Sequence, residues 1–255
     1  MVRAINFSQD GSLVAISRQD GVIELRDSQK DGRIYLKWVS DDNDHEPVLG
    51  LAFSPLHERG ADRLVTVTRT GIKIWDVSQL KKRKYGMFED RNDAPPKIVS
   101  ETIFGRDLGD AAGGVAYSPD GRLIATSANN GAVMIWDVSK EDGASADLLV
   151  TLNQRKGRIT NLTFNPYFNP GESAYQLATV SADDQTTKLW EFPDLPKLRS
   201  LQRLVKDLET REGEADKHHL ETILKEAESF LPAKRRRLTE REFNEYLKPL
   251  ESGDR

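Results

Sequence analysis

The sequence predicts an all-β fold of four small antiparallel sheets followed by a helical extension. One pattern, an alternating strand, a tight turn and two further strands, occurs four times between residues 2 and 192. After residue 192, apolar residues recur instead at helical spacing. The boundaries we expect are 1–40, 41–108, 109–153 and 154–192 for the four units and 193–255 for the helical tail.

Each repeat begins with a strand that ends in an aromatic residue, and these anchors are Phe7, Phe53, Tyr117 and Phe164. Residues with strong turn propensity follow, as in Ser118-Pro119-Asp120-Gly121. A second strand of small residues, another turn and a third, alternating strand come next, so each repeat is predicted to form an antiparallel meander. A further strand is expected after three of the repeats, at 33–40, 98–104 and 148–152.

A tryptophan followed by an acidic residue ends the third strand of three repeats. These pairs are Trp75-Asp76, Trp136-Asp137 and Trp190-Glu191. With the turns upstream of them, they resemble the WD-repeat family of β-propellers over residues 2–192. The resemblance implies a partial or open four-bladed propeller that binds other proteins as a scaffold.

The same resemblance implies a hydrogen-bonded set of His, Ser or Thr, Asp and Trp in each blade, which this sequence keeps only in part. The pieces are Thr179 or Ser181 with Asp184 and Trp190, Ser127 with Asn130 and Trp136, His45 with Trp75, and Ser17 with Asp20. Arg155 stands in the place of a histidine in the fourth repeat, and Arg26 replaces the tryptophan of the first. Each such bond contributes about 1 kcal/mol net, so partial loss weakens a blade without forbidding it.

The fourth repeat lacks an outermost strand because Phe192 runs directly into Pro193-Asp194-Leu195-Pro196. The family resemblance would take that strand from the N-terminus, where only Met1 precedes Val2. An uncovered sheet edge favours pairing with another chain. Three arrangements stay open: the last blades of a longer protein, a ring of about eight blades made by a homodimer or with another half-propeller, or a self-closed ring of about four.

The tail contains amphipathic stretches, and its segment RRRLTEREFNEYL resembles the tails that follow propellers in large bacterial signalling ATPases. That resemblance implies the C-terminal sensor or regulatory part of a multidomain signalling protein. The tail also holds the basic run Lys234, Arg235, Arg236 and Arg237. This run is a possible basic patch for a nucleic-acid-associated adaptor, although a solvated helix junction is the simpler interpretation.

Composition and motifs exclude several classes of function. The chain of 255 residues has a net charge of −4, which gives no overall attraction for nucleic acid or for an anionic membrane. It contains no cysteine, which excludes disulfides and thiolate metal sites and favours a reducing, cytoplasmic location. No stretch is apolar enough for a signal peptide or a membrane span.

No catalytic motif emerges from the sequence. It has no Gly-rich phosphate loop, no GxSxG elbow and no histidine spacing suited to a metal, so neither a cofactor nor a metal is expected. We therefore expect a non-catalytic scaffold for protein–protein interaction, with the long charged insertion at 79–108 as a binding loop. The alternatives are the nucleic-acid adaptor and a hydrolase built on a propeller scaffold.

Overall fold

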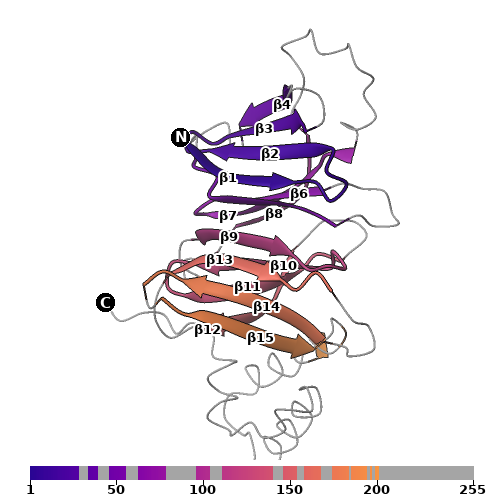
Figure 1. Ribbon diagram of the computed structural model, residues 1–255. Coiled ribbons are helices and arrows are strands. Elements are labelled where there is room, and N and C mark those ends of the chain that lie inside the picture. The colour runs from indigo at the N-terminus through magenta and orange to yellow at the C-terminus, as the bar shows by residue number, and fades with distance from the viewer. Residues whose placement is uncertain are drawn as a thin grey trace, which may run out of the picture.

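The computed structural model describes residues 1–28, 34–39, 46–55, 63–78, 96–103, 111–139, 146–153, 158–167, 174–183, 185–193, 196 and 199–200. In this part the chain folds into four antiparallel sheets, or blades, arranged in chain order (Figure 1). The predicted all-β, four-bladed architecture is therefore confirmed. Most of the predicted helical tail lies outside the described residues, as do His45, Asp184, the run Lys234–Arg237 and most of the insertion.

The strands follow one another from the inside of each blade to its outside. Blade 1 contains β1 (Val2–Phe7), β2 (Leu13–Arg18), β3 (Val22–Asp27) and β4 (Ile34–Val39). Blade 2 contains β5 (Gly50–Phe53), β6 (Arg63–Val67), β7 (Gly71–Asp76) and β8 (Lys97–Ile103). Blade 3 contains β9 (Ala111–Tyr117), β10 (Leu123–Ala128), β11 (Ala132–Asp137) and β12 (Asp147–Asn153). Blade 4 has three strands within the described residues, β13 (Ile159–Phe164), β14 (Ala174–Ser181) and β15 (Thr187–Pro193).

A serine-centred turn joins the first two strands of blades 1 and 3. In blade 3, Ser118 Oγ donates to Asp120 Oδ1 at 2.5 Å, and the backbone N–H of Leu123 donates to Ser118 Oγ at 2.9 Å. Gly121 completes the turn with a φ of 66°, in the left-handed region that favours glycine. Blade 1 forms the same bonds around Ser8. The predicted turn chemistry thus fixes the strand register of both blades.

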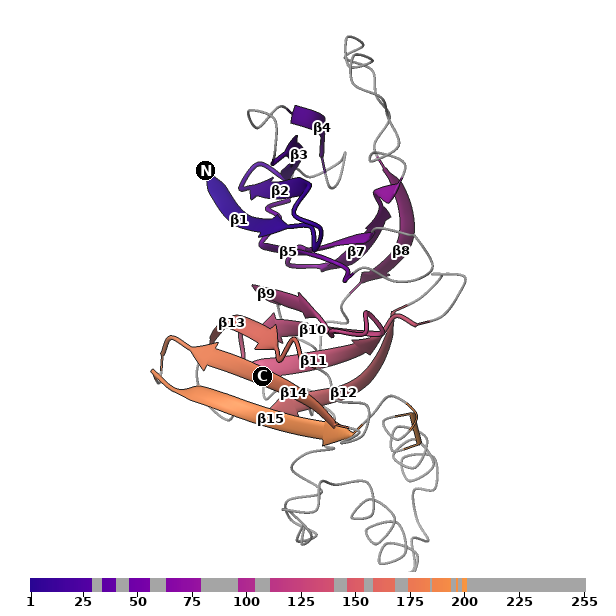
Figure 2. The ribbon, with the colours of Figure 1, turned by 45° about the vertical axis from the view of Figure 1, so that its right-hand side comes forward.

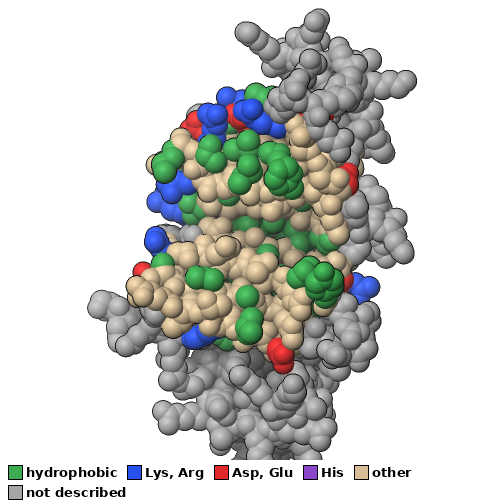
Figure 3. All heavy atoms as spheres, in the orientation of Figure 1, with side chains coloured by type: hydrophobic (Ala, Val, Ile, Leu, Met, Phe, Trp, Pro, Cys, Tyr) green, Lys and Arg blue, Asp and Glu red, His purple; other side chains and the backbone are tan. Residues whose placement is uncertain are grey.

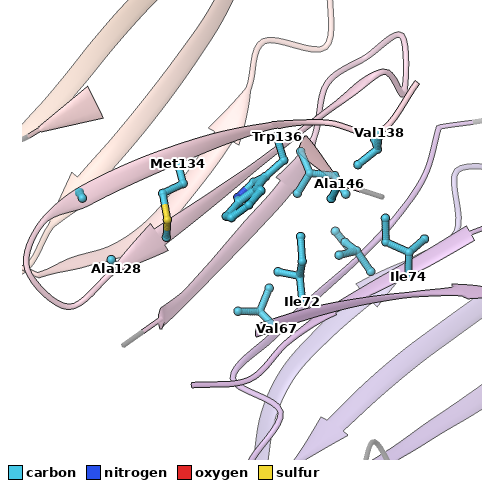
Figure 4. Packing of buried hydrophobic residues seen from close by; sticks show 12 residues of the cluster. Val67, Ile72, Ile74, Ala128, Met134, Trp136, Val138 and Ala146 are labelled. Atoms are coloured by element: carbon cyan, nitrogen blue, oxygen red, sulfur yellow. The ribbon is translucent and has the colours of Figure 1, made fainter. Parts of the chain in front are cut away.

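The hydrophobic core lies between the blades, where adjacent sheets pack face to face. At the junction of blades 2 and 3, Ile72 and Ile74 face Met134 and Trp136 (Figure 4). Blades 1 and 2 share a second cluster, and blades 3 and 4 a third. Each interior sheet therefore has two buried faces, one against the preceding blade and one against the following blade.

Two inner strands approach each other backbone to backbone. A Cβ at Gly50 of β5 would lie 2.0 Å from the carbonyl oxygen of Gly113 in β9, and Gly113 itself has a φ of 95°. Only glycine accommodates both the contact and the conformation. The junction of blades 2 and 3 is thus specified by backbone geometry as well as by side chains.

The four blades form an arc that stays open. The inner strands pack in succession, β1 on β5, β5 on β9 and β9 on β13, and Figure 2 shows blades 1 and 4 as the two ends of a V-shaped arc. Ile5 of blade 1 is 60% exposed and Leu189 of blade 4 is 77% exposed. The terminal sheets do not cover each other, so the structure differs from the self-closed ring, one of the three arrangements left open by the sequence.

Candidate interaction surface

The tryptophans of blades 2, 3 and 4 each make the same type of hydrogen bond. In each blade the indole Nε1 donates to a threonine Oγ1 on the second strand; the pairs are Trp75–Thr66 at 2.9 Å, Trp136–Thr126 at 2.8 Å and Trp190–Thr179 at 2.9 Å. Thr179 was one of the two partners expected in blade 4. Sequence reasoning missed Thr66 and Thr126. In each of these three blades the threonine lies two residues after the residue that pairs with the tryptophan across the sheet, and this constant spacing is the signal that could have identified them.

The other predicted members of the set act locally. Asn130 Oδ1 accepts the backbone N–H of Ala132 at 3.0 Å, and Asp20 Oδ1 accepts that of Val22 at 3.4 Å, so both side chains stabilise their own turns. Ser127, expected to pair with the tryptophan of blade 3, instead accepts a hydrogen bond from Gly114 N at 3.0 Å. The expected pairing of Ser127 with Trp136 is therefore wrong, because Ser127 lies on the opposite face of its strand.

The aspartates that follow the tryptophans of blades 2 and 3 stabilise the turns after the third strand. Asp76 Oδ1 accepts bonds from the backbone N–H and hydroxyl of Ser78, and Asp137 Oδ1 accepts the same pair from Ser139. Asp137 also binds Arg199, whose Nε donates to Asp137 Oδ2 at 2.7 Å. Burial works against ionisation of Asp137, but the bonds from Arg199 and Ser139 outweigh it and hold its pKa below the ordinary value.

Two of the aromatic anchors are buried, one is partly buried and one is exposed. Phe53 and Phe164 belong to the cores between blades, and Tyr117 packs against the core of blades 2 and 3. Burial raises the pKa of the Tyr117 phenol far above its ordinary value, with the charge of Arg63 opposing it, so the ring stays neutral. Phe7, the corresponding residue of blade 1, is 59% exposed.

The orientation of β1 explains this exposure. Ala4 packs into the core of blades 1 and 2, and Asn6 Oδ1 accepts the backbone N–H of Phe53 at 3.1 Å. Because side chains alternate along a strand, Ile5 and Phe7 point to the other side of the sheet. We call this side of blade 1 the N-side face; it carries Ile5, Phe7, Val14, Ile16, Arg18, Glu24, Arg26, Ile34 and Lys37.

An arginine and an isoleucine take the places of the tryptophan and the threonine on the N-side face. Arg26 lies opposite Val14, at the position of the tryptophans, and Ile16 occupies the position of the threonines. Glu24 is buried and binds two arginines, with Arg26 Nη2 at 2.6 Å and Arg18 Nε at 3.2 Å. The face is therefore an apolar surface with a central ion cluster and a surplus of basic residues.

The opposite end of the arc presents the other side of blade 4, which we call the C-side face. It carries Asn161, Thr163, Gln176, Ala178, Val180, Thr187, Leu189 and Glu191. Leu189 and Val180 are exposed, whereas Ile135 and Ser127, which hold the same register positions in blade 3, are buried against blade 4. Figure 3 shows both ends of the arc from one side, with hydrophobic side chains gathered over the inner part of blade 1.

Between the two ends lies a hollow of about 810 Å³ lined by the four inner strands. Within the described residues, no group of His, Cys, Asp or Glu side chains could hold a metal ion. No helix in the described part of the chain is long and apolar enough to cross a membrane.

Comparison with known proteins agrees with this geometry. The family model described as WD domain, G-beta repeat matches residues 109–137, which include β9, β10 and β11 of blade 3. The chain has the fold of a WD-repeat β-propeller. WD-repeat propellers are generally non-enzymatic scaffolds for protein interaction, and no curated protein matches this chain in sequence.

Among solved structures, the chain is similar to the C-terminal WD40 domain of Sif2. The match has a TM-score of 0.50 and 13% sequence identity, and it covers 74% of this chain and 45% of that one. At this identity the likeness establishes the fold alone. The propeller described here spans less than half the length of the solved chain that it matches.

Proposed function

We propose that this propeller is a non-catalytic scaffold for protein–protein interaction, completed by a protein partner at the ends of its arc. The observation that carries the proposal is the exposure of Ile5 and Phe7, at 60% and 59%. The register makes them equivalent to Leu51 and Phe53 of blade 2, which are buried against blade 1. Blade 1 thus carries apolar residues suited to a neighbouring blade.

The energetics of these side chains support a partner. Burying one large apolar side chain contributes roughly 1.5–3 kcal/mol, and contiguous exposed apolar residues with a polar rim are typical of binding surfaces. Arg18 and Arg26 keep the face soluble when it is uncovered, while their partial burial with Glu24 fixes their position. A surface of this kind favours reversible association with another protein.

The biological setting is part of the proposal. The resemblance of the tail to those of multidomain signalling proteins supports a sensor or regulatory role, and the absence of cysteine supports a cytoplasmic location. We favour this setting over the nucleic-acid adaptor because the net charge of −4 disfavours binding to phosphate backbones. The sequence carries no motif that supports a hydrolase.

Site-specific photo-crosslinking in cells tests the scaffold proposal. A photoreactive amino acid at position 7 is expected to give a discrete protein adduct, because Phe7 lies on the proposed contact surface. Ile98, which is 41% exposed on the outer strand β8, provides the control position and is expected to give none. A chain without any adduct specific to position 7 would contradict the proposal.

A further inference from the structure

We infer, building on the proposed function, that the partner is a second copy of this chain. In this arrangement the C-side face of blade 4 in one copy packs on the N-side face of blade 1 in the other copy. The reverse contact forms at the other end of the two arcs. The two copies then make one closed ring with a two-fold axis.

The interior junctions define what an N-side face requires. At each of them, the aromatic anchor and the tryptophan of one blade pack with apolar residues of the preceding blade. At the junction of blades 3 and 4, Phe164 and Trp190 meet Ala125 and Ile135. The N-side face of blade 1 is therefore complementary in kind to the C-side face of another blade.

Within the described residues, blade 4 offers the C-side face that lacks a following blade. Its Ala178 and Leu189 correspond in register to Ala125 and Ile135 of blade 3. Leu189 is 77% exposed, whereas Ile135 is fully buried against blade 4. The chain thus carries both halves of one blade junction, one at each end of its arc.

Charge favours the same pairing. The N-side face has Arg18, Arg26 and Lys37 around the single carboxylate of Glu24. Glu191 is the charged residue that we assign to the C-side face. It lies two residues after Leu189 on the same face of β15, next to the position that Arg26 would face in the dimer. Opposite signs across the contact favour the head-to-tail pairing over a pairing of two N-side faces.

The direction of the two faces allows both junctions to form at once. Blade 1 lies in front of blade 2 and blade 4 in front of blade 3 in Figure 1, and the turned view in Figure 2 places both terminal blades on the open side of the arc. A two-fold rotation on that side brings each end of one copy to the opposite end of the other. A closed assembly of this symmetry ends at two copies and does not grow into a filament.

A pair of charge variants tests the inference by complementation. Sedimentation of the full chain at about 100 µM, where even weak junctions are populated, is expected to give twice the chain mass of 28.7 kDa. Phe7→Lys or Leu189→Glu alone is expected to give monomers, because either substitution alters both junctions of a dimer. An equimolar mixture of the two variants is expected to restore the dimer, since one junction is then unaltered and the other joins lysine to glutamate.

Matched controls separate the possible outcomes. Ile98→Lys alters an exposed apolar residue of β8 and is expected to leave the dimer intact. Restoration on mixing also demonstrates that both variants are folded. A monomeric wild-type chain, a larger polymer or a mixture that stays monomeric would overturn the inference. A position-7 adduct with a different protein would overturn it too, yet leave the scaffold proposal standing.

Discussion

Blades 1 and 3 have the same turn between their first two strands, but they differ in the face that carries the third-strand tryptophan or its replacement. Both contain the serine-centred turn, with the same hydrogen bonds at Ser8 and Ser118. In blade 3, Trp136 is buried and bonded to Thr126. In blade 1, Arg26 holds the corresponding position and pairs with Glu24.

The comparison separates two requirements of a blade. The turn makes a meander whatever the blade packs against, so it is present in both blades. The tryptophan matters only where another blade covers it, as Trp38 of blade 1 covers Trp75 of blade 2 with ring centroids 5.6 Å apart. A terminal face must instead tolerate water while its partner is absent, and charged residues around an apolar surface meet that need.

Substitution of Trp136, on the third strand of blade 3, is expected to have the largest effect on the free energy of unfolding. Trp136→Ala should lower the free energy of unfolding by about 4 kcal/mol, because it opens a cavity in the core of blades 2 and 3. Arg26→Ala, its counterpart in blade 1, should cost about 1 kcal/mol, since Glu24 keeps its pair with Arg18. Urea denaturation of both variants as monomers measures the difference, and equal losses would show that the two faces are not energetically distinct.

The glycine contact between β5 and β9 gives the second expected effect. Gly50→Ala should lower the free energy of unfolding by about 3 kcal/mol, because its Cβ would overlap the carbonyl oxygen of Gly113. Gly11→Ala is the matched control: its Cβ would meet nothing within 4 Å, and its positive φ costs about 1 kcal/mol. If Gly50→Ala proved no more harmful than Gly11→Ala, the close approach of these strands would be refuted.

The meanders could be predicted from the sequence because their signals are local. The turn at Ser118 and the strands β10 and β11 lie within about twenty residues, so the turn residues indicated an antiparallel meander. Within the described residues the last blade has three strands, and the sequence indicated this locally, where Phe192 runs into Pro193.

Features that join distant parts of the chain could not be predicted in this way. Tyr175 OH donates to Asp120 Oδ2 at 2.7 Å across the junction of blades 3 and 4, and no pattern in the sequence relates the two residues. The exposure of Phe7 was hidden for a related reason. Phe7 and Phe164 both end the first strand of a repeat, and the position of blade 1 at the end of the arc makes their exposure differ.

The smallest predicted effect concerns the attachment of the segment after blade 4 to blade 3. Hydrogen bonds from Arg199 and Ser139 lower the pKa of Asp137 in the folded chain despite its burial. In the unfolded chain the same carboxyl has a pKa of about 3.9, so the unfolded chain binds the proton first as the pH falls. The stabilisation is thus present at neutral pH and is lost below about pH 4. Arg199→Ala should cost under about 1 kcal/mol at pH 7, since the guanidinium is 43% exposed, and less at pH 3. Urea denaturation at both pH values measures the change in the free energy of unfolding, and Ser200→Ala is the neighbouring control. A cost of Arg199→Ala that did not vary with pH would show that Asp137 is not its partner.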